Sequence, residues 1–266
     1  MEHLNLTLEE NEILNAAIEE ALTPIPENSP SLLIDEKTSR FSSAIWFDEI
    51  KKQEVVIAGL GGIGSWLSLL LSRLQMKGMY LFDMDIVDIS NVSGQLYKTY
   101  NVGKRKTASI TDIIREFSSN YATSSFDEYN NHSMTSNIMI CGFDNMEARK
   151  TFYYNWKKRV NFIEDKDKCL FIDGRLSADC FQILCIQGND AYNMNKYEKD
   201  YLFTDEEADP TICSFKQTSF MANMIASYMV NLFVNFIANQ CNPIIPKDVP
   251  FYTEYNADNL YSKIIF

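Results

Sequence analysis

The chain has 266 residues, with 24 Lys and Arg against 36 Asp and Glu, so its formal net charge is −12. That length suits one large α/β domain or two small ones, and a hydrophobic content of 46% is sufficient for a buried core. An acidic surface repels nucleic-acid phosphates and anionic lipid headgroups, so we expect neither nucleic acid nor a membrane as a partner.

Metal-binding and export patterns are scarce in the sequence. His3 and His132 are the only histidines, and the six cysteines form no CxxC pair, so we expect no zinc. The acidic opening MEHLNLTLEENE is not followed by an apolar leader. We therefore expect a cytoplasmic protein with free thiols.

The chain reads as an N-terminal extension followed by one domain. Residues 1–50 are predicted to form a helical extension that ends in the linker TPIPENSPS. In residues 51–266, apolar runs alternate with a helical pattern. Strands are predicted at 55–60, 79–85, 137–144, 170–176 and 181–187, and a helix at 63–75. This order predicts an α/β fold, a Rossmann-like doubly wound, mostly parallel sheet with flanking helices.

Two contrasting segments lie near the end of the domain. Residues 189–210 are polar and acidic, which predicts a long surface excursion, whereas residues 217–240 contain no charge. The uncharged segment is long enough to cross a membrane, but polar residues recur along it every four positions. They are Asn223, Ser227, Asn231, Asn235 and Asn239. Because such a stripe is costly in lipid, we predict a buried core or subunit-interface helix.

A glycine-rich turn, Gly59-Leu60-Gly61-Gly62-Ile63-Gly64, follows the first strand and opens the first helix. Glycines let the backbone approach a phosphate, and the free N–H groups of a helix start supply partial positive charge. The next strand ends in Asp83-Met84-Asp85, about 20 residues later, where an acidic side chain can bind ribose hydroxyls. These features fit NAD and ATP equally well. The turn alone also fits tight helix–strand packing without a ligand.

The segments that follow distinguish these alternatives. Asn91 and Gln95 come after the second strand, then Gly103-Lys104-Arg105-Lys106, and a later strand ends in Cys141-Gly142-Phe143-Asp144-Asn145 with Arg149 following. This ordered set resembles the ThiF/MoeB-type adenylyltransferases, the family that includes the ubiquitin-activating enzymes, over most of the chain. The resemblance implies ATP and Mg²⁺ as cofactors.

The resemblance also implies a role for each matching residue. It places the nucleotide phosphates at Gly59, Gly61, Gly62, Gly64, Asn91 and Lys106, and the ribose at Asp83. Further nucleotide contacts are implied at Asp85, Gln95 and Asn145, and Mg²⁺ is implied at Asp144. Lys106 and Asp144 would be catalytic. Adenylation needs such groups, because a carboxylate that attacks ATP approaches a polyanion. Taken singly, Asp144-Asn145 also fits a helix N-cap, and Lys104-Arg105-Lys106 also fits a solvated basic patch.

Two family arginines are replaced. The family's Asn-x-x-Arg-Gln has Gly94 at the arginine position, and its Arg-Tyr-x-Arg element reads Arg40-Phe41-Ser42-Ser43, with Ser43 in place of the second arginine. The candidates to compensate are Arg40, Lys104, Arg105 and Arg175. Asp173-Gly174-Arg175 and Thr211-Ile212-Cys213 resemble a short bacterial branch of the family. Cys213, near Lys216 and a helix start, is a candidate thioester nucleophile, although it also fits a small buried hydrophobe.

The pattern as a whole predicts an ATP-dependent adenylyltransferase that activates the C-terminal carboxylate of a small ubiquitin-like or sulfur-carrier protein, with possible transfer to a cysteine. We expect a homodimer, in which the carrier's tail lies under a crossover loop within residues 189–216. Two alternatives remain open. The first is a catalytically weakened nucleotide-binding scaffold subunit, and the second is an NAD-dependent oxidoreductase.

Overall fold

A computed structural model describes residues 38–119, 122–204 and 217–266. The chain divides into two units, residues 1–43 and residues 44–266. The described end of the first unit is a turn, in which the carbonyl of Thr38 accepts hydrogen bonds from the N–H groups of Phe41 and Ser42. The expected N-terminal helix and Cys213 lie outside the described residues, and the helical extension over residues 1–50 stays a prediction.

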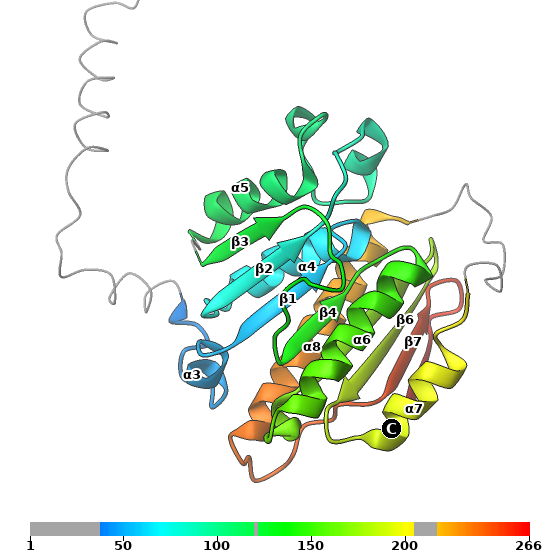
Figure 1. The fold of residues 1–266 in the computed structure, drawn as a ribbon. Helices are drawn as coiled ribbons and strands as arrows, with labels where there is room; N and C mark the ends of the chain where they lie inside the picture. Colours follow the sequence, from blue (N-terminus) through cyan, green and yellow to red (C-terminus); the bar gives the residue numbers. More distant parts are fainter. Residues whose placement is uncertain (1–37, 120–121, 205–216) are drawn as a thin grey trace, which may run out of the picture. The chain divides into compact units, whose positions relative to one another are not determined.

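The second unit contains an eight-stranded sheet with the order β3-β2-β1-β4-β5-β6-β7-β8 (Figure 1). The strands are β1 (Glu54–Ala58), β2 (Gly78–Phe82), β3 (Thr123–Phe126), β4 (Ile138–Cys141), β5 (Leu170–Leu176), β6 (Cys180–Gln187), β7 (Tyr252–Asn256) and β8 (Tyr261–Ile265). The pairs from β3 to β5 are parallel, and those from β5 to β8 are antiparallel. The prediction of a mostly parallel, doubly wound sheet is confirmed.

Helices cover both faces of this sheet. They are α3 (Phe47–Ile50), α4 (Gly62–Ser72), α5 (Lys106–Ser118), α6 (Met146–Phe162), α7 (Ala191–Asp200) and α8 (Ser219–Gln240). Successive residues of β1 belong to different cores. Val55 and Ile57 pack with α4, α5 and α8, whereas Val56 and Ala58 pack with α6 and α7. Figure 1 shows α6 on the near side of the sheet and α8 on the far side. This alternation is the side-chain period of a strand that is buried on both faces.

The predicted strands and first helix are found, with shifted ends. The second strand ends at Phe82 rather than at residue 85, and the carboxylate of the following Asp83 accepts from the backbone N–H groups of Leu60 and Asp85. Three short 3₁₀ helices lie in the connections: η1 (Ile89–Ser93), η2 (Thr99–Asn101) and η3 (Lys166–Lys168).

The surface excursion expected over residues 189–210 begins with a helix, α7. Asp190 caps this helix, with its Oδ1 accepting from the N–H of Asn193 at 2.9 Å. Met194 and Tyr197, three positions apart, are buried against the sheet. These two side chains form the buried face of a helix that is otherwise mostly polar.

Helix α8 is the one described helix that is long and apolar enough to span a membrane, and half of its most apolar stretch is buried. It packs against α4, β5 and β6. The polar stripe has local partners, since the side-chain amides of Asn235 and Asn239 donate to the carbonyls of Asp248 and Lys247. These contacts place α8 as a core helix with hydrogen-bonded amides along one side.

Candidate functional site

The carboxyl ends of β1, β2, β4 and β5 meet along one edge of the sheet, because these strands are parallel neighbours. We call this region the strand-end edge. It consists of residues 59–64, 83–85, 142–145 and 173–175. Ligands of open α/β sheets bind at such an edge, where the strand order reverses on either side of β1. Most of the predicted site residues therefore lie in one region.

Two glycines of the turn are required by packing. Gly59 has φ +84°, and a Cβ added to it would lie 2.5 Å from the carbonyl carbon of Gly142. A Cβ on Gly64 would lie 1.9 Å from the carbonyl oxygen of Gly59. The packing interpretation that the sequence left open is thus correct for these two positions, whether or not a phosphate binds.

The other end of the turn is open. Gly61 is the N-cap of α4 and provides no side-chain hydrogen bond, and a Cβ added to it would meet only Nε2 of Gln95, at 3.9 Å. Gln95 is 8% exposed, and its Oε1 is buried without a hydrogen-bond partner among the described residues. The uncapped helix start offers N–H groups to an anionic oxygen, and Oε1 of Gln95 can accept from a hydroxyl.

Asp83 fixes the shape of this turn. Its side chain is buried, with Oδ2 accepting from the N–H of Leu60 at 2.7 Å and Oδ1 accepting from the N–H of Asp85 at 2.8 Å. Burial raises the pKa of the Asp83 carboxyl, and the charge of Lys106 opposes that rise. The hydroxyl of Tyr97 donates to the carbonyl of Leu60 at 2.7 Å. The ribose contact of Asp83 stays a prediction.

The structure brings Lys106 and Asp85 together. Nζ of Lys106 lies 2.8 Å from Oδ2 of Asp85, with the lysine side chain 8% exposed and the aspartate side chain 59% exposed. The side chain of Asn91 stabilises its own turn, because its Oδ1 accepts from the N–H of Asp88 at 2.9 Å. The neighbouring Lys104 lies over the ring of Tyr100, 4.3 Å from its centroid. The phosphate contacts of Lys106 and Asn91 stay predictions.

Asp144 and Asn145 lie in the loop between β4 and α6. Oδ1 of Asn145 accepts from the N–H of Ala148 at 2.8 Å, so this side chain is the N-cap of α6. Asp144 is exposed. Within residues 38–119, 122–204 and 217–266, no group of three His, Cys, Asp or Glu side chains could hold a metal ion. A Mg²⁺ ion at Asp144 would thus take its other oxygens from substrate and water, as Mg²⁺ commonly does.

A buried ion-pair network at the end of β5 was missed by the sequence reasoning. Asp173 is fully buried and forms ion pairs with Arg149 from α6 and with Arg175, whose Nη2 lies 3.0 Å from Oδ2. The hydroxyl of Tyr197 donates to the same oxygen at 2.9 Å. Arg149 also donates to the carbonyl of Phe143, directly before Asp144. The signal in the sequence was the alternation Asp173-Gly174-Arg175, which places both charges on one face of a strand.

The described cysteines are free, and burial raises the pKa of each thiol. The pKa is raised to about 11 for Cys169 and to about 12 for Cys185. Thiols in such surroundings are poor nucleophiles at neutral pH. None of these five cysteines, Cys141, Cys169, Cys180, Cys185 and Cys241, was predicted to react.

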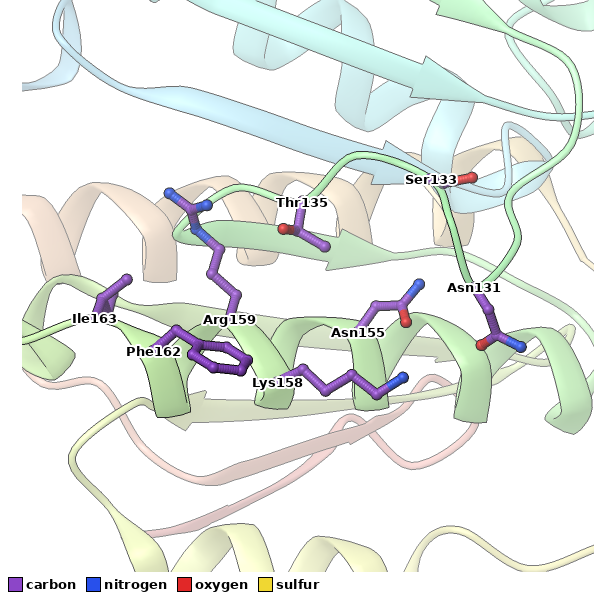
Figure 2. A pocket seen from close by; sticks show the side chains of 8 residues that line it. All are labelled: Asn131, Ser133, Thr135, Asn155, Lys158, Arg159, Phe162 and Ile163. Atoms are coloured by element: carbon purple, nitrogen blue, oxygen red, sulfur yellow. The ribbon is translucent and has the colours of Figure 1, made fainter.

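Two shallow cavities lie elsewhere. Figure 2 shows one of about 310 Å³, formed by the connection before β4 and the C-terminal half of α6, with Lys158, Arg159 and Phe162 among its lining residues. A second, of about 290 Å³, lies between α6 and the start of α7. Neither is lined by a predicted site residue. The candidate site is thus an edge of the sheet rather than one of these hollows.

A side chain at position 94 would crowd Gln217. A Cβ added to Gly94 would lie 3.1 Å from Cγ of Gln217, and the carbonyl of Gly94 accepts from Nε1 of Trp66 at 3.1 Å. Gln217 was not among the predicted site residues. Arg40 and Ser43 belong to the first unit, and both are exposed.

Comparison with known proteins places these features in a family. The model of the ThiF family matches residues 39–261. "Ubiquitin-like modifier-activating enzyme 5" of Dictyostelium discoideum is 32% identical over 90 residues, which are 31% of this chain and 24% of that protein. "Adenylyltransferase and sulfurtransferase uba4" of Aspergillus terreus is 36% identical over 69 residues, 26% of this chain and 14% of that protein. The matched region thus spans a quarter or less of these relatives.

A solved structure of E. coli MccB with ATP has the same fold, with a TM-score of 0.63, 16% identity, and coverage of 98% of this chain and 79% of MccB. The likeness in fold therefore extends over nearly the whole chain, whereas the curated sequence matches are local. Because the family model covers most of the chain, including the whole strand-end edge, the chain belongs to the ThiF family.

Proposed function

We propose that this protein is an ATP-dependent adenylyltransferase that activates the C-terminal carboxylate of a small ubiquitin-like or sulfur-carrier protein. The observation that carries the proposal is the start of α4, where Gly61 leaves the helix uncapped beside the buried, unsatisfied carboxamide of Gln95. Oriented N–H groups at a helix start bind phosphate. The names of two relatives, a modifier-activating enzyme and an adenylyltransferase, support the same chemistry.

Different residues of this chain can carry out different parts of the adenylation reaction. The N–H groups at the start of α4 hold phosphate oxygens, and Lys106, already paired with Asp85, adds positive charge behind them. Exposed Asp144 offers oxygen ligands to Mg²⁺, which when bound neutralises phosphate charge. The carrier's carboxylate oxygen forms a bond to the α-phosphorus of ATP, and the bond to pyrophosphate breaks. The products are an acyl-adenylate and pyrophosphate.

Further parts of the proposal concern the partners. A carrier with a flexible tail would extend that tail along the strand-end edge. A second copy of the chain would complete a homodimer, as the family resemblance implies. If the acyl group passes to a cysteine, Cys213 is the candidate, because the pKa of every described thiol is raised by burial.

A second candidate is a nucleotide-binding scaffold without catalysis. Two observations favour it: position 94 has no side chain, and the Lys106 ammonium group is already paired with Asp85. The first leaves out the positive charge that the family resemblance implies at residue 94, and the second offsets part of the charge of Lys106. Such a scaffold would bind ATP but would not exchange pyrophosphate.

The two candidates are separated by ATP–pyrophosphate exchange, measured with carrier proteins that end in Gly and are encoded beside this gene. We expect exchange only when the cognate carrier is present, and we expect Asp144→Ala to lower its rate by about 100-fold or more. Asp165→Ala, an exposed aspartate near the other end of α6 that pairs with Lys168, is the matched control.

Two results of these measurements would change the proposal. Exchange that survives Asp144→Ala would remove the metal role of that residue. ATP binding by calorimetry without exchange, in the presence of the cognate carrier, would favour the scaffold.

A further inference from the structure

Gln217 is held beside the start of α4 by the helix that follows it. The next residue, Thr218, is the N-cap of α8, with its Oγ1 accepting from the N–H of Met221 at 3.4 Å. Helix α8 packs along α4, and the backbone oxygen of Gln217 would lie 3.4 Å from a Cβ added to Gly94. The position of Gln217 is therefore set by core packing.

The side chain of Gln217 extends between two glycines. At one end, a Cβ added to Gly94 would lie 3.1 Å from its Cγ. At the other end, a Cβ added to Gly62, the first residue of α4, would lie 1.7 Å from its Oε1. The carboxamide therefore rests on the flank of the first turn of α4, and any side chain at residue 62 would displace it.

The backbone does not explain the glycine at position 94. Its φ of −120° and ψ of −27° are accessible to any residue. The reason is steric, because a side chain at this position would push against Gln217. A side chain at position 94 would therefore have to share this space with Gln217.

The carboxamide of Gln217 is a neutral hydrogen-bond donor and acceptor at the uncapped start of α4. A second carboxamide, that of the buried Gln95, faces Gly61 on the same turn, and its Oε1 has no partner among the described residues. The two carboxamides therefore flank the helix start, one at Gly61 and the other at Gly62. Each carboxamide has an NH2 group that can donate to a phosphate oxygen and an oxygen that can accept from a hydroxyl, and neither adds charge.

We propose that Gln217 is a phosphate-contacting residue of the nucleotide site, which reaches the start of α4 from α8 in place of the side chain that residue 94 lacks. This inference rests on the proposed function, because it takes ATP to bind at the same turn. It assigns a nucleotide contact to a segment that lies far along the chain from the glycine turn.

The test combines Gln217→Ala, Gly94→Arg and the double variant. ATP affinity is measured by calorimetry, and the melting temperature is measured without nucleotide. Gln217→Ala should weaken ATP binding by about tenfold or more, the loss expected for a hydrogen bond to a charged group, with an unchanged melting temperature. Gly94→Arg alone should lower the melting temperature, because its side chain displaces Gln217.

The double variant should regain both the melting temperature and the ATP affinity, because the arginine then has room to reach the phosphates. Gln240→Ala, at the far end of α8, is the matched control and should bind ATP as the unmodified protein does. Unchanged or tighter ATP binding by Gln217→Ala would overturn the inference while leaving the proposed function intact. Absence of ATP binding by the unmodified protein would overturn both.

Discussion

Two buried aspartates at the strand-end edge are satisfied in different ways. Asp83, after β2, accepts backbone N–H groups from Leu60 and Asp85, whereas Asp173, in β5, is paired with the guanidinium groups of Arg149 and Arg175. The first carboxylate shapes the turn before α4. The second binds its cations within the protein, and one of them, Arg149, also donates to the carbonyl of Phe143 before Asp144. One aspartate thus fixes a turn through the backbone, and the other fixes a loop through a buried arginine.

The largest expected loss of stability is that of a variant without the Asp173 carboxylate, which binds two arginines. Asp173→Ala would leave Arg149 and Arg175 buried without their carboxylate, and removing one partner of a buried ion pair costs about 3–5 kcal/mol of unfolding free energy. Urea denaturation measures the change. The exposed Asp165→Ala variant is the control and should unfold as the unmodified protein does. If Asp173→Ala unfolded like this control, the network would not contribute to stability.

A smaller loss of stability is expected at Asp83, whose carboxylate binds backbone N–H groups. Asp83→Asn retains one carbonyl oxygen in place of two carboxylate oxygens, so the N–H of Leu60 or of Asp85 loses its acceptor. An unsatisfied buried donor costs about 1–3 kcal/mol, measured by the same denaturation. A loss as large as that of Asp173→Ala would show that the two regions are not built differently.

The pH dependence of the Asp83 variant sharpens this comparison. Burial raises the pKa of Asp83 in the folded state above its ordinary value of 3.8, so the folded protein holds this proton more tightly than the unfolded chain does. Stability from this group is then present below 3.8 and is lost as the pH rises through the raised pKa. The difference in unfolding free energy between the unmodified protein and Asp83→Asn should therefore decrease as the pH rises from 3.8 through the raised pKa. An advantage that grows with pH would mean that the N–H groups lower the pKa.

Local patterns in the sequence predict the elements of this fold where burial is strong. The apolar runs that become β1, β4 and β5 are buried on both faces, so each gives a continuous signal. Helix α7 was missed because only Met194 and Tyr197 mark its buried face. Strand β8 is exposed along its whole length, so its sequence has no buried face to indicate a strand.

The candidate site was predictable in position but not in its contacts. Strand order places Gly61, Asp83 and Asp144 at one edge, and the order of motifs identifies the family. The partners of each side chain depend on packing between distant segments. No local pattern indicates that Gln217 fills the space at Gly94, because that contact exists only once α8 has packed on α4.

The nucleotide preference of the strand-end edge is measured most directly by calorimetric titration of the unmodified protein with ATP and, in parallel, with NADH. The proposed adenylyltransferase predicts saturable binding of ATP in the presence of Mg²⁺ and no saturable binding of NADH. Saturable binding of NADH with no binding of ATP would contradict the proposed adenylyltransferase and would favour an NAD-dependent oxidoreductase.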